Sequence, residues 1–425
     1  MTKNSKDFLV VILGKISQVL LTFVTLKLST SLLTPDNMGQ VYLFTTIYTF
    51  FVFFLISPIG QYFNRYTHQW ENDGVLLNKL YIYFCYMLFI SIGATFGAYF
   101  IYDSGVVDGF ALPVFVSLIS LFVLVVSANQ TVIPLLNMLN YRVSFTVLTF
   151  FTSLISLISS VVILNYSEKT AVSWLIGIVF GNTLILFIGL IYLKRILVVQ
   201  RKSINNIMGN KFFCKIKLAE IIRFALPVSI ATIFMWAQNS GYRISIENYK
   251  GAHYLGLIGI GLIVSTQLSS VVESILTQYL QPIFYRNLQG ANVETRCKSV
   301  NSYLNITIPI YFALAIFLTF SIEYIFPVLV SLEYKNASIY CIYGVWIEFF
   351  RMMCNSISVV SHSELKMKGY MYSYVIGALF TNSLVYYSST LSLSYDFIPL
   401  SLVIGALATF IVMFINMKKN YDFFN

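Results

Sequence analysis

The sequence predicts an all-α integral membrane protein with about twelve transmembrane helices. Of its 425 residues, 58% are hydrophobic and only 10% are charged, whereas soluble domains carry about 25% charged residues. The mean hydropathy is +0.77. The apolar residues gather in segments of roughly 20, the length that a helix needs to cross the hydrocarbon core while its backbone hydrogen bonds stay internal.

Twelve apolar segments are expected to form the membrane spans. The first is longer than the apolar core of a secretory signal and lacks a small-residue cleavage site, so we expect it to be retained as a helix. Most connections between segments are short and polar. The expected spans are residues 8–33, 40–63, 79–102, 110–133, 143–165, 172–193, 221–247, 256–280, 300–325, 337–360, 370–390 and 397–416.

The distribution of basic residues predicts the orientation of these spans. With a cytoplasmic N-terminus, twenty of the 27 Lys and Arg residues fall on the inner side, and the outer loops hold only Lys169, Lys250 and Lys335. This asymmetry follows the positive-inside rule. We therefore expect an inner-membrane protein with both termini in the cytoplasm, whose net charge of +10 faces anionic lipid headgroups rather than nucleic acid.

The longest polar stretch divides the chain into two halves. We expect an N-terminal six-helix lobe at 1–198, a basic cytoplasmic connector at 199–219 and a C-terminal six-helix lobe at 220–425. Residues 38–42 (MGQVY) are weakly similar to residues 255–259 (LGLIG), as expected of a parallel repeat. Many transporters build alternating access from two such bundles around a central cavity.

Polar residues on the first helix mark one possible lining of that cavity. Residues recur at three- and four-residue steps, which places them on one helical face; they are Lys15, Gln18, Thr22, Thr25 and Ser29. A polar stripe on an apolar span is expected to face water. Two interpretations of Lys15 stay open, since its long side chain could instead reach the headgroups, as we expect for Lys27.

The seventh helix carries a second polar stripe, formed by Thr232, Trp236, Asn239, Arg243 and Glu247. Arg243 is the strongest candidate for substrate binding, because a guanidinium is always charged and binds phosphate oxygens in a bidentate manner. The alternative is a structural ion pair with Glu247, four residues further on.

The eighth and tenth helices add further ionisable groups. The eighth presents Gln267, Ser270, Glu273, Ser274 and Thr277 on one face. Glu273 is expected to pair with a basic residue, and the alternative is that it carries a coupling proton. Glu348 and Arg351 lie three residues apart on the tenth helix and are interpreted as a structural pair. Together, Lys15, Lys27, Arg243 and Arg351 exceed Glu273 and Glu348 by two charges, which favours an anionic substrate.

Several chemistries are not indicated by the sequence. The five cysteines form no C-x-x-C pair and the three histidines are scattered, so we expect neither a disulfide nor a metal site. No P-loop, G-x-S-x-G or H-E-x-x-H motif occurs. The outer loops are too small to hold a catalytic domain. We therefore expect a transporter without a cofactor rather than an enzyme.

Three segments give the sequence a family resemblance. They are residues 32–42 (LLTPDNMGQVY), the seventh span from 224–227 (FALP) through Trp236 to Arg243, and residues 333–337 (EYKNA). Over nearly its whole length, the chain resembles the Wzx O-antigen flippases of the multidrug/oligosaccharidyl-lipid/polysaccharide exporter superfamily. Where that family often has Asp-Arg, this chain has Tyr242 and Arg243, with Glu247 one turn later.

The resemblance implies a specific function. Such proteins move an undecaprenyl-pyrophosphate-linked oligosaccharide from the cytoplasmic to the periplasmic leaflet, as a step in lipopolysaccharide biosynthesis. It also implies a cavity, often cationic, lined by helices one, two, seven and eight. The expected partners are the lipid-linked oligosaccharide and membrane lipids, with an O-antigen polymerase and a chain-length regulator as further neighbours. A proton or sodium gradient and downstream consumption of the product both stay open as energy sources.

Two other functions are retained as alternatives. A multidrug antiporter of the same superfamily would also have twelve spans in two lobes, with an acidic rather than a basic cavity. An integral-membrane O-antigen polymerase would be expected to have a large external loop, which this sequence lacks.

Overall fold

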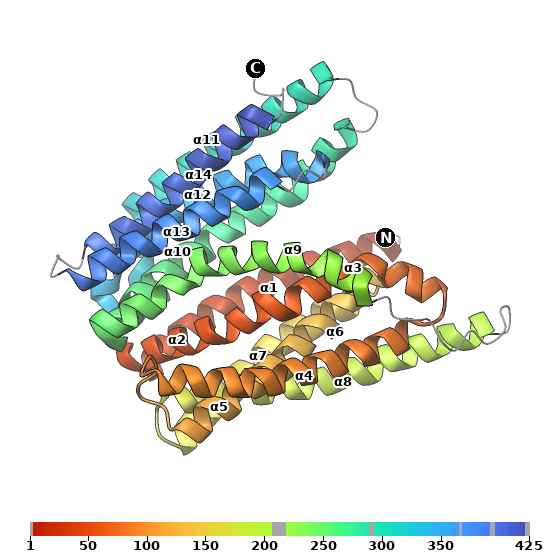
Figure 1. The fold of residues 1–425 in the computed structure, drawn as a ribbon, viewed down its shortest axis with the longest axis horizontal. Coiled ribbons are helices and arrows are strands. Elements are labelled where there is room, and N and C mark those ends of the chain that lie inside the picture. Colours follow the sequence, from red (N-terminus) through yellow and green to blue (C-terminus); the bar gives the residue numbers. More distant parts are fainter. Residues whose placement is uncertain (1–2, 206–217, 289–292, 365–367, 392–395, 421–425) are drawn as a thin grey trace. The chain divides into compact units, whose positions relative to one another are not determined.

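The computed structural model describes residues 3–205, 218–288, 293–364, 368–391 and 396–420. Every regular element within these ranges is a helix (Figure 1). In the first half of the chain they are α1 (Lys3–Leu32), α2 (Pro35–Phe51), η1 (Val52–Ile56), α3 (Ser57–Asn72), α4 (Leu76–Asp103), α5 (Leu112–Leu121), η2 (Phe122–Val126), α6 (Ser127–Met138), α7 (Arg142–Tyr166) and α8 (Ala171–Asn205). The all-α prediction is confirmed.

The second half continues in the same way. Its elements are α9 (Leu218–Trp236), η3 (Ala237–Gly241), α10 (Tyr242–Leu288), α11 (Val293–Leu329), η4 (Leu332–Ala337), α12 (Ser338–Glu364), α13 (Lys368–Thr390) and α14 (Phe397–Asn420). Elements η1, η2 and η3 are single π-helical turns inside longer helices, and η4 is a short 3-10 helix.

Eight helical segments in the described residues are long and apolar enough to cross a membrane, so the chain is a multi-pass membrane protein. They are Pro35–Asn72, Leu76–Asp103, Leu112–Met138, Arg142–Tyr166, Ala171–Val198, Ala219–Asn287, Glu294–Leu329 and Phe397–Lys419. Ala219–Asn287 contains two expected spans, because the chain turns at Gly251, whose φ of 81° is a conformation that glycine adopts readily. The other three expected spans coincide with α1, α12 and α13, which hold 30, 27 and 23 residues.

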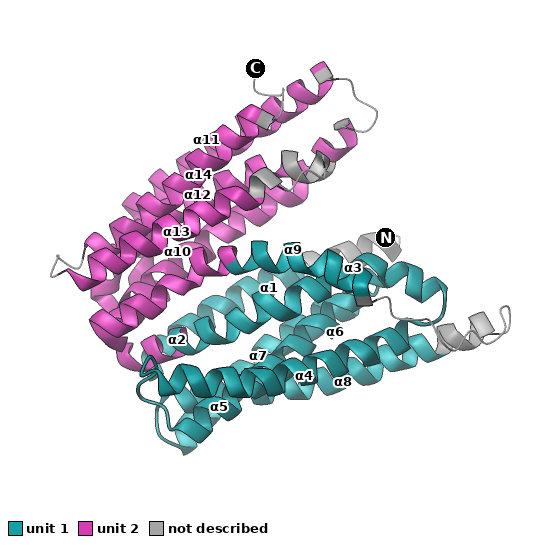
Figure 2. Ribbon diagram, viewed as in Figure 1, with its two compact units in different colours: residues 1–33, 43–233 teal, residues 34–42, 234–425 magenta. Residues whose placement is uncertain are grey.

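The chain packs into two compact units (Figure 2). Unit 1 contains Met1–Leu33 and Leu43–Ile233, and unit 2 contains Thr34–Tyr42 and Phe234–Asn425. Helices α2 and α9 therefore each contribute to both units. The division does not coincide with the expected connector at 199–219, much of which lies outside the described residues, and the expected lobe boundaries stay a prediction.

Helices α7 and α8 of unit 1 pack closely through small residues. A Cβ atom on Gly177 would lie 2.3 Å from the Cα of Ser160, and one on Gly181 would lie 2.4 Å from the backbone nitrogen of Ser156. The Ser160 hydroxyl donates to the Trp174 carbonyl across this contact, at 2.9 Å. In a membrane, close packing at small residues and interhelical hydroxyl bonds of this kind both favour helix association.

Backbone carbonyls of the π-helical turns accept hydrogen bonds from side chains of neighbouring helices. Within unit 1, Thr232 of α9 donates to the carbonyl of Phe53 in η1 at 2.6 Å, and Tyr86 of α4 donates to that of Leu55 at 2.8 Å. Within unit 2, Asn382 of α13 donates to the carbonyl of Ala237 in η3 at 2.9 Å. Since a π turn shifts the local hydrogen-bond ladder, these donors stabilise it.

Segment Thr34–Tyr42 packs against the part of α10 that follows Gly251, inside unit 2. A Cβ atom on Gly39 would lie 2.0 Å from the carbonyl oxygen of Ala252. One on Gly259 would lie 2.3 Å from the ring of Tyr42. The pair of Asp36 and His253 lies beside this contact, with 3.0 Å between Oδ2 and Nδ1. The glycines thus bring Tyr42 up against α10.

Candidate functional site

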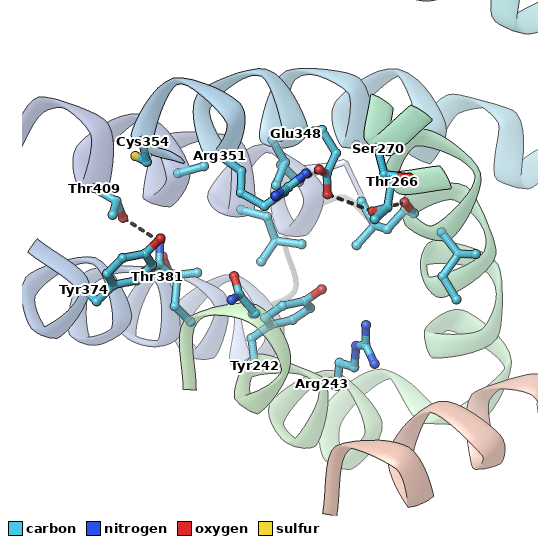
Figure 3. Close-up of a pocket in the computed structure, with 18 of the residues that line it drawn as sticks. Tyr242, Arg243, Thr266, Ser270, Glu348, Arg351, Cys354, Tyr374, Thr381 and Thr409 are labelled. Atoms are coloured by element: carbon cyan, nitrogen blue, oxygen red, sulfur yellow. Dashed lines mark hydrogen bonds and ion pairs between the residues drawn. The ribbon is translucent and has the colours of Figure 1, made fainter. Parts of the chain in front are cut away.

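Unit 2 contains a cavity of about 500 Å³, called cavity A (Figure 3). Its wall comes from η3, α10, α12, α13 and α14. The polar lining residues are Gln238, Asn239, Tyr242, Arg243, Thr266, Ser270, Glu273, Glu348, Arg351, Tyr374, Thr381 and Thr409. A volume of this size lies within the range of about 300–1,000 Å³ that is usual for small-molecule sites.

An ionic network forms one side of cavity A. Arg351 donates from Nη2 to Glu273 Oε2 at 2.7 Å and from Nε to Glu348 Oε2 at 2.5 Å. The second oxygen of Glu348 accepts from the Thr266 hydroxyl at 2.8 Å, and that of Glu273 accepts from the Asn355 amide at 2.7 Å. Each carboxylate oxygen therefore has a donor, which is how buried charges are normally accommodated.

Arg243 lies on the opposite side of cavity A (Figure 3). Its guanidinium carbon is 5.5 Å from the ring centroid of Tyr42 and 6.0 Å from that of Tyr242, a cation–π arrangement. The ion pairs resolved in the described residues do not include Arg243. Of the two arginines that line cavity A, Arg351 is neutralised by carboxylates, and Arg243 keeps its donors for a ligand.

The π turn η3 supplies the amide side of the cavity. Gln238 donates from Nε2 to the Thr409 hydroxyl at 2.5 Å. Within the described part of the chain, Gln238 Oε1 and Thr381 Oγ1 are buried without a hydrogen-bond partner. Buried polar atoms are normally paired, so these two atoms are exceptions in the wall of the cavity.

A second cavity of about 360 Å³, called cavity B, shares Glu273 with cavity A. It is formed by the last part of α10, the first part of α11 and the last part of α12. Its wall is almost entirely polar and consists of Glu273, Thr277, Gln281, Tyr285, Tyr303, Tyr311, Asn355, Ser356, Ser358 and Val359. The ionic network thus separates two adjoining spaces in unit 2.

Unit 1 has a smaller cavity of about 280 Å³, called cavity C, between α1, α7 and α8. Its polar wall consists of Thr22, Thr25, Thr152, Ser153, Ser156, Ser160, Trp174 and Asn182. The hydroxyls of Thr22 and Thr25 donate to carbonyls of their own helix, those of Gln18 and Leu21. Among the described residues the wall of cavity C holds no ionic side chain, and it offers hydroxyls, one indole and one amide.

The residues predicted to bind substrate separate into three groups. Asn239, Arg243, Ser270 and Glu273 line cavity A, and Thr22 and Thr25 line cavity C. Lys15 is exposed on α1, Gln18 is half-buried, and Trp236 packs beside Gly241; these three line none of the cavities A, B and C. A binding role for each of the nine stays a prediction.

The ionic balance of cavity A differs from the expected surplus of positive charge. Arg243 and Arg351 are matched by Glu273 and Glu348, so the four groups sum to zero. The expected surplus came from Lys15 and Lys27, which belong to unit 1. Cavity A is therefore polarised, with Arg243 on one side and one more carboxylate than guanidinium on the other.

Sequence reasoning missed several lining residues, above all Gln238, Thr381 and Thr409. Single threonines in apolar helices usually bond their own backbone, as Thr409 does with Gly405 at 2.8 Å, so sequence alone gives them no distinguishing signal. Gln238 sits next to Asn239 of the predicted stripe, and both belong to the π turn η3.

The fold is that of known membrane transporters. The structure is similar to an inward-facing multidrug resistance MATE family transporter of the MOP superfamily, with a TM-score of 0.64, 12% identity and coverage of 96% of this chain and 94% of that one. It is similar to the lipid II flippase MurJ in an inward closed conformation, with a TM-score of 0.60, 14% identity and coverage of 96% and 87%.

A third similar structure is a MOP superfamily transporter from Pyrococcus furiosus described by a reversed polarity of its binding pocket, with a TM-score of 0.56, 13% identity and coverage of 96% and 94%. The sequence matches no protein-family model and no curated protein. At these identities the likeness establishes the fold: this chain is a multi-pass membrane protein with the fold of MOP superfamily transporters. Both flippases and drug exporters have that fold.

Proposed function

We propose that the protein is a flippase for undecaprenyl-pyrophosphate-linked O-antigen repeat units, or for similar lipid-linked polysaccharide units. It moves them by alternating access from the cytoplasmic to the periplasmic leaflet of the bacterial inner membrane, with both of its termini in the cytoplasm. The observation that carries this proposal is Arg243, the arginine of cavity A that no described carboxylate neutralises.

The polarity of cavity A suits a phosphorylated glycan. A pyrophosphate carries oxygen acceptors that a guanidinium binds through two parallel hydrogen bonds. Sugar hydroxyls are donors as well as acceptors, and they match the carboxylates and amides on the other side, including Glu348 and Gln238. One ligand of this kind would satisfy both sides of the cavity, while its polyprenyl tail stays in lipid. The fold likeness to MurJ, a lipid II flippase, supports the same class of substrate.

A multidrug antiporter is the second candidate. The network of Glu273, Arg351 and Glu348 has one more carboxylate than guanidinium, and a cationic drug would be attracted to such a site. The fold likeness to MATE transporters is equally compatible with this function. Cavity A also holds Arg243, however, whose positive charge would repel a drug cation and brings the four ionic groups of the cavity to zero net charge.

A strain that lacks this gene tests the proposal. Surface polysaccharide is assayed by gel, and lipid-linked units are identified by mass spectrometry of membrane extracts. Loss of the long-chain ladder, with single undecaprenyl-linked units trapped on the cytoplasmic leaflet, is the expected result. Normal polysaccharide with increased sensitivity to cationic drugs would favour the multidrug antiporter. Units that reach the periplasm without being polymerised would indicate a polymerase.

A further inference from the structure

Cavity B has the wall of a carbohydrate site. Apart from Val359, every described residue that lines it has a polar side chain, although the cavity lies among helices that cross the membrane. Tyr303, Tyr311 and Ser356 are 6%, 1% and 3% exposed. Placing that many hydroxyls in a membrane-spanning bundle is unfavourable unless they have partners, so such residues usually line a functional space.

The hydroxyls of cavity B are arranged as a connected group. The phenol of Tyr303 lies next to the side chains of Gln281 and Ser356, and the phenol of Tyr311 lies next to Ser356. Phenols and serine hydroxyls both donate and accept hydrogen bonds. The exposed ring of Tyr285 also offers an apolar face, which suits the C–H side of a pyranose. This mixture of hydroxyls, amides and aromatic faces matches a sugar ring.

The charge of cavity B favours a neutral ligand. Glu273 is its one ionisable acidic side chain in the described residues, and Arg351 and Asn355 bind its two oxygens at 2.7 Å each. No Lys or Arg lines the cavity in that part of the chain. The charge of Glu273 is already offset by Arg351, and an anionic ligand would find no cation among the described lining residues. A neutral sugar needs neither.

We propose that cavity B binds a neutral sugar of the transported glycan and so selects among substrates. The proposal rests on the function proposed above, and it deepens that function by naming the chemistry of one subsite. Glu273 lines both cavities, so a sugar in cavity B would lie on the far side of the ionic network from a phosphate bound by Arg243 in cavity A. In the orientation expected from the basic residues, cavity B lies toward the cytoplasm.

The first test is direct binding to the purified full-length protein. Saturation-transfer NMR with the methyl glycosides of glucose, galactose and N-acetylglucosamine reports on weak sugar contacts. The test variant is Tyr303→Phe/Tyr311→Phe, which removes two hydroxyls and keeps the rings. Its matched control is Tyr279→Phe, on an exposed tyrosine of α10 that does not line the cavity.

Binding of at least one glycoside to the wild type and the control is expected, weakened about three- to tenfold for each hydroxyl removed in the double variant. Absence of binding to the wild type, or equal binding to the double variant, would overturn the proposal. Unchanged yield and elution profile of the double variant show that it is folded. Binding of methyl α-glucoside 6-phosphate in preference to the neutral glycosides would also overturn it.

A transport assay separates this proposal from the function on which it rests. Proteoliposomes are loaded with polyprenyl pyrophosphate that carries a neutral disaccharide, or with the same lipid without sugar. The double variant is expected to slow only the glycosylated lipid. Equal slowing of both lipids would overturn the sugar-subsite proposal. If glycosides bind cavity B and neither lipid moves with the wild type, the flippase function fails while the sugar site stands.

Discussion

Gly39 and Gly256 occupy equivalent positions in a reciprocal contact within unit 2. A Cβ atom on Gly39 would lie 2.0 Å from the carbonyl oxygen of Ala252, and one on Gly256 would lie 1.9 Å from that of Pro35. The spacing in sequence from Pro35 to Gly39 equals that from Ala252 to Gly256. Reciprocal contacts of this form arise at a two-fold axis. The contact joins the two segments whose sequences are weakly repeated.

This contact predicts that alanine is poorly tolerated at both glycines. A methyl group would collide with backbone, which cannot move as a flexible side chain does, and overpacking of this kind costs about 1–3 kcal/mol. Gly39→Ala and Gly256→Ala are expected to lower the unfolding temperature in detergent and the abundance in membranes. Gly93→Ala is the control, since a Cβ there would have nothing within 4 Å. Equal unfolding temperatures for all three variants would contradict the close contact.

The ionic network predicts that removing Arg351 alone lowers stability more than removing all three of its charged groups. Removing the guanidinium in Arg351→Met leaves Glu273 and Glu348 without their shared cation, and such an uncompensated buried charge costs about 3–5 kcal/mol. Adding Glu273→Gln and Glu348→Gln to that variant is expected to restore most of the lost stability. Thermal unfolding of the purified single and triple variants checks this. A triple variant no more stable than Arg351→Met would show that the loss has another cause.

The π turn η3 predicts a role for Asn382. In Asn382→Leu the part-buried carbonyl of Ala237 loses its donor, and loss of such a hydrogen bond costs about 0.5–1.5 kcal/mol. The turn also places Gln238 in cavity A, so ligand affinity is expected to fall together with stability. Asn248→Leu is the control on an exposed asparagine. Binding and unfolding of Asn382→Leu that match the wild type would mean that η3 persists without this bond.

The orientation of the spans predicts which loops can be labelled from outside the cell. After the five native cysteines are replaced, Asp108→Cys is expected to react with a membrane-impermeant maleimide in intact spheroplasts. Lys202→Cys is expected to react only after the membrane is permeabilised, because the basic segment around it should be cytoplasmic. The reversed pattern would place both termini on the periplasmic side.

Most helices could be predicted from the sequence, because apolar length alone determines which segments cross lipid. The pairing of Glu348 with Arg351 could also be predicted, since both lie on one face of α12. Two contacts could not be predicted: the pairing of Glu273 with Arg351 and the position of Arg243 over Tyr42. Both depend on which helices pack together, and the polar stripes do not show this. The π turns could not be predicted from the sequence either, because they shift the backbone hydrogen bonds by one residue without changing the pattern of apolar residues.

The most direct test of the proposed function is transport by the purified protein in vesicles. Proteoliposomes containing a fluorescent polyprenyl-pyrophosphate-linked disaccharide report its movement between leaflets by quenching from outside. The wild type is expected to move the lipid, Arg243→Ala to slow it at least tenfold through loss of a charge-assisted contact, and Arg286→Ala, an exposed arginine, to match the wild type. Movement no faster than in protein-free vesicles would contradict the flippase function. An Arg243→Ala variant as fast as the wild type would contradict the binding role of Arg243.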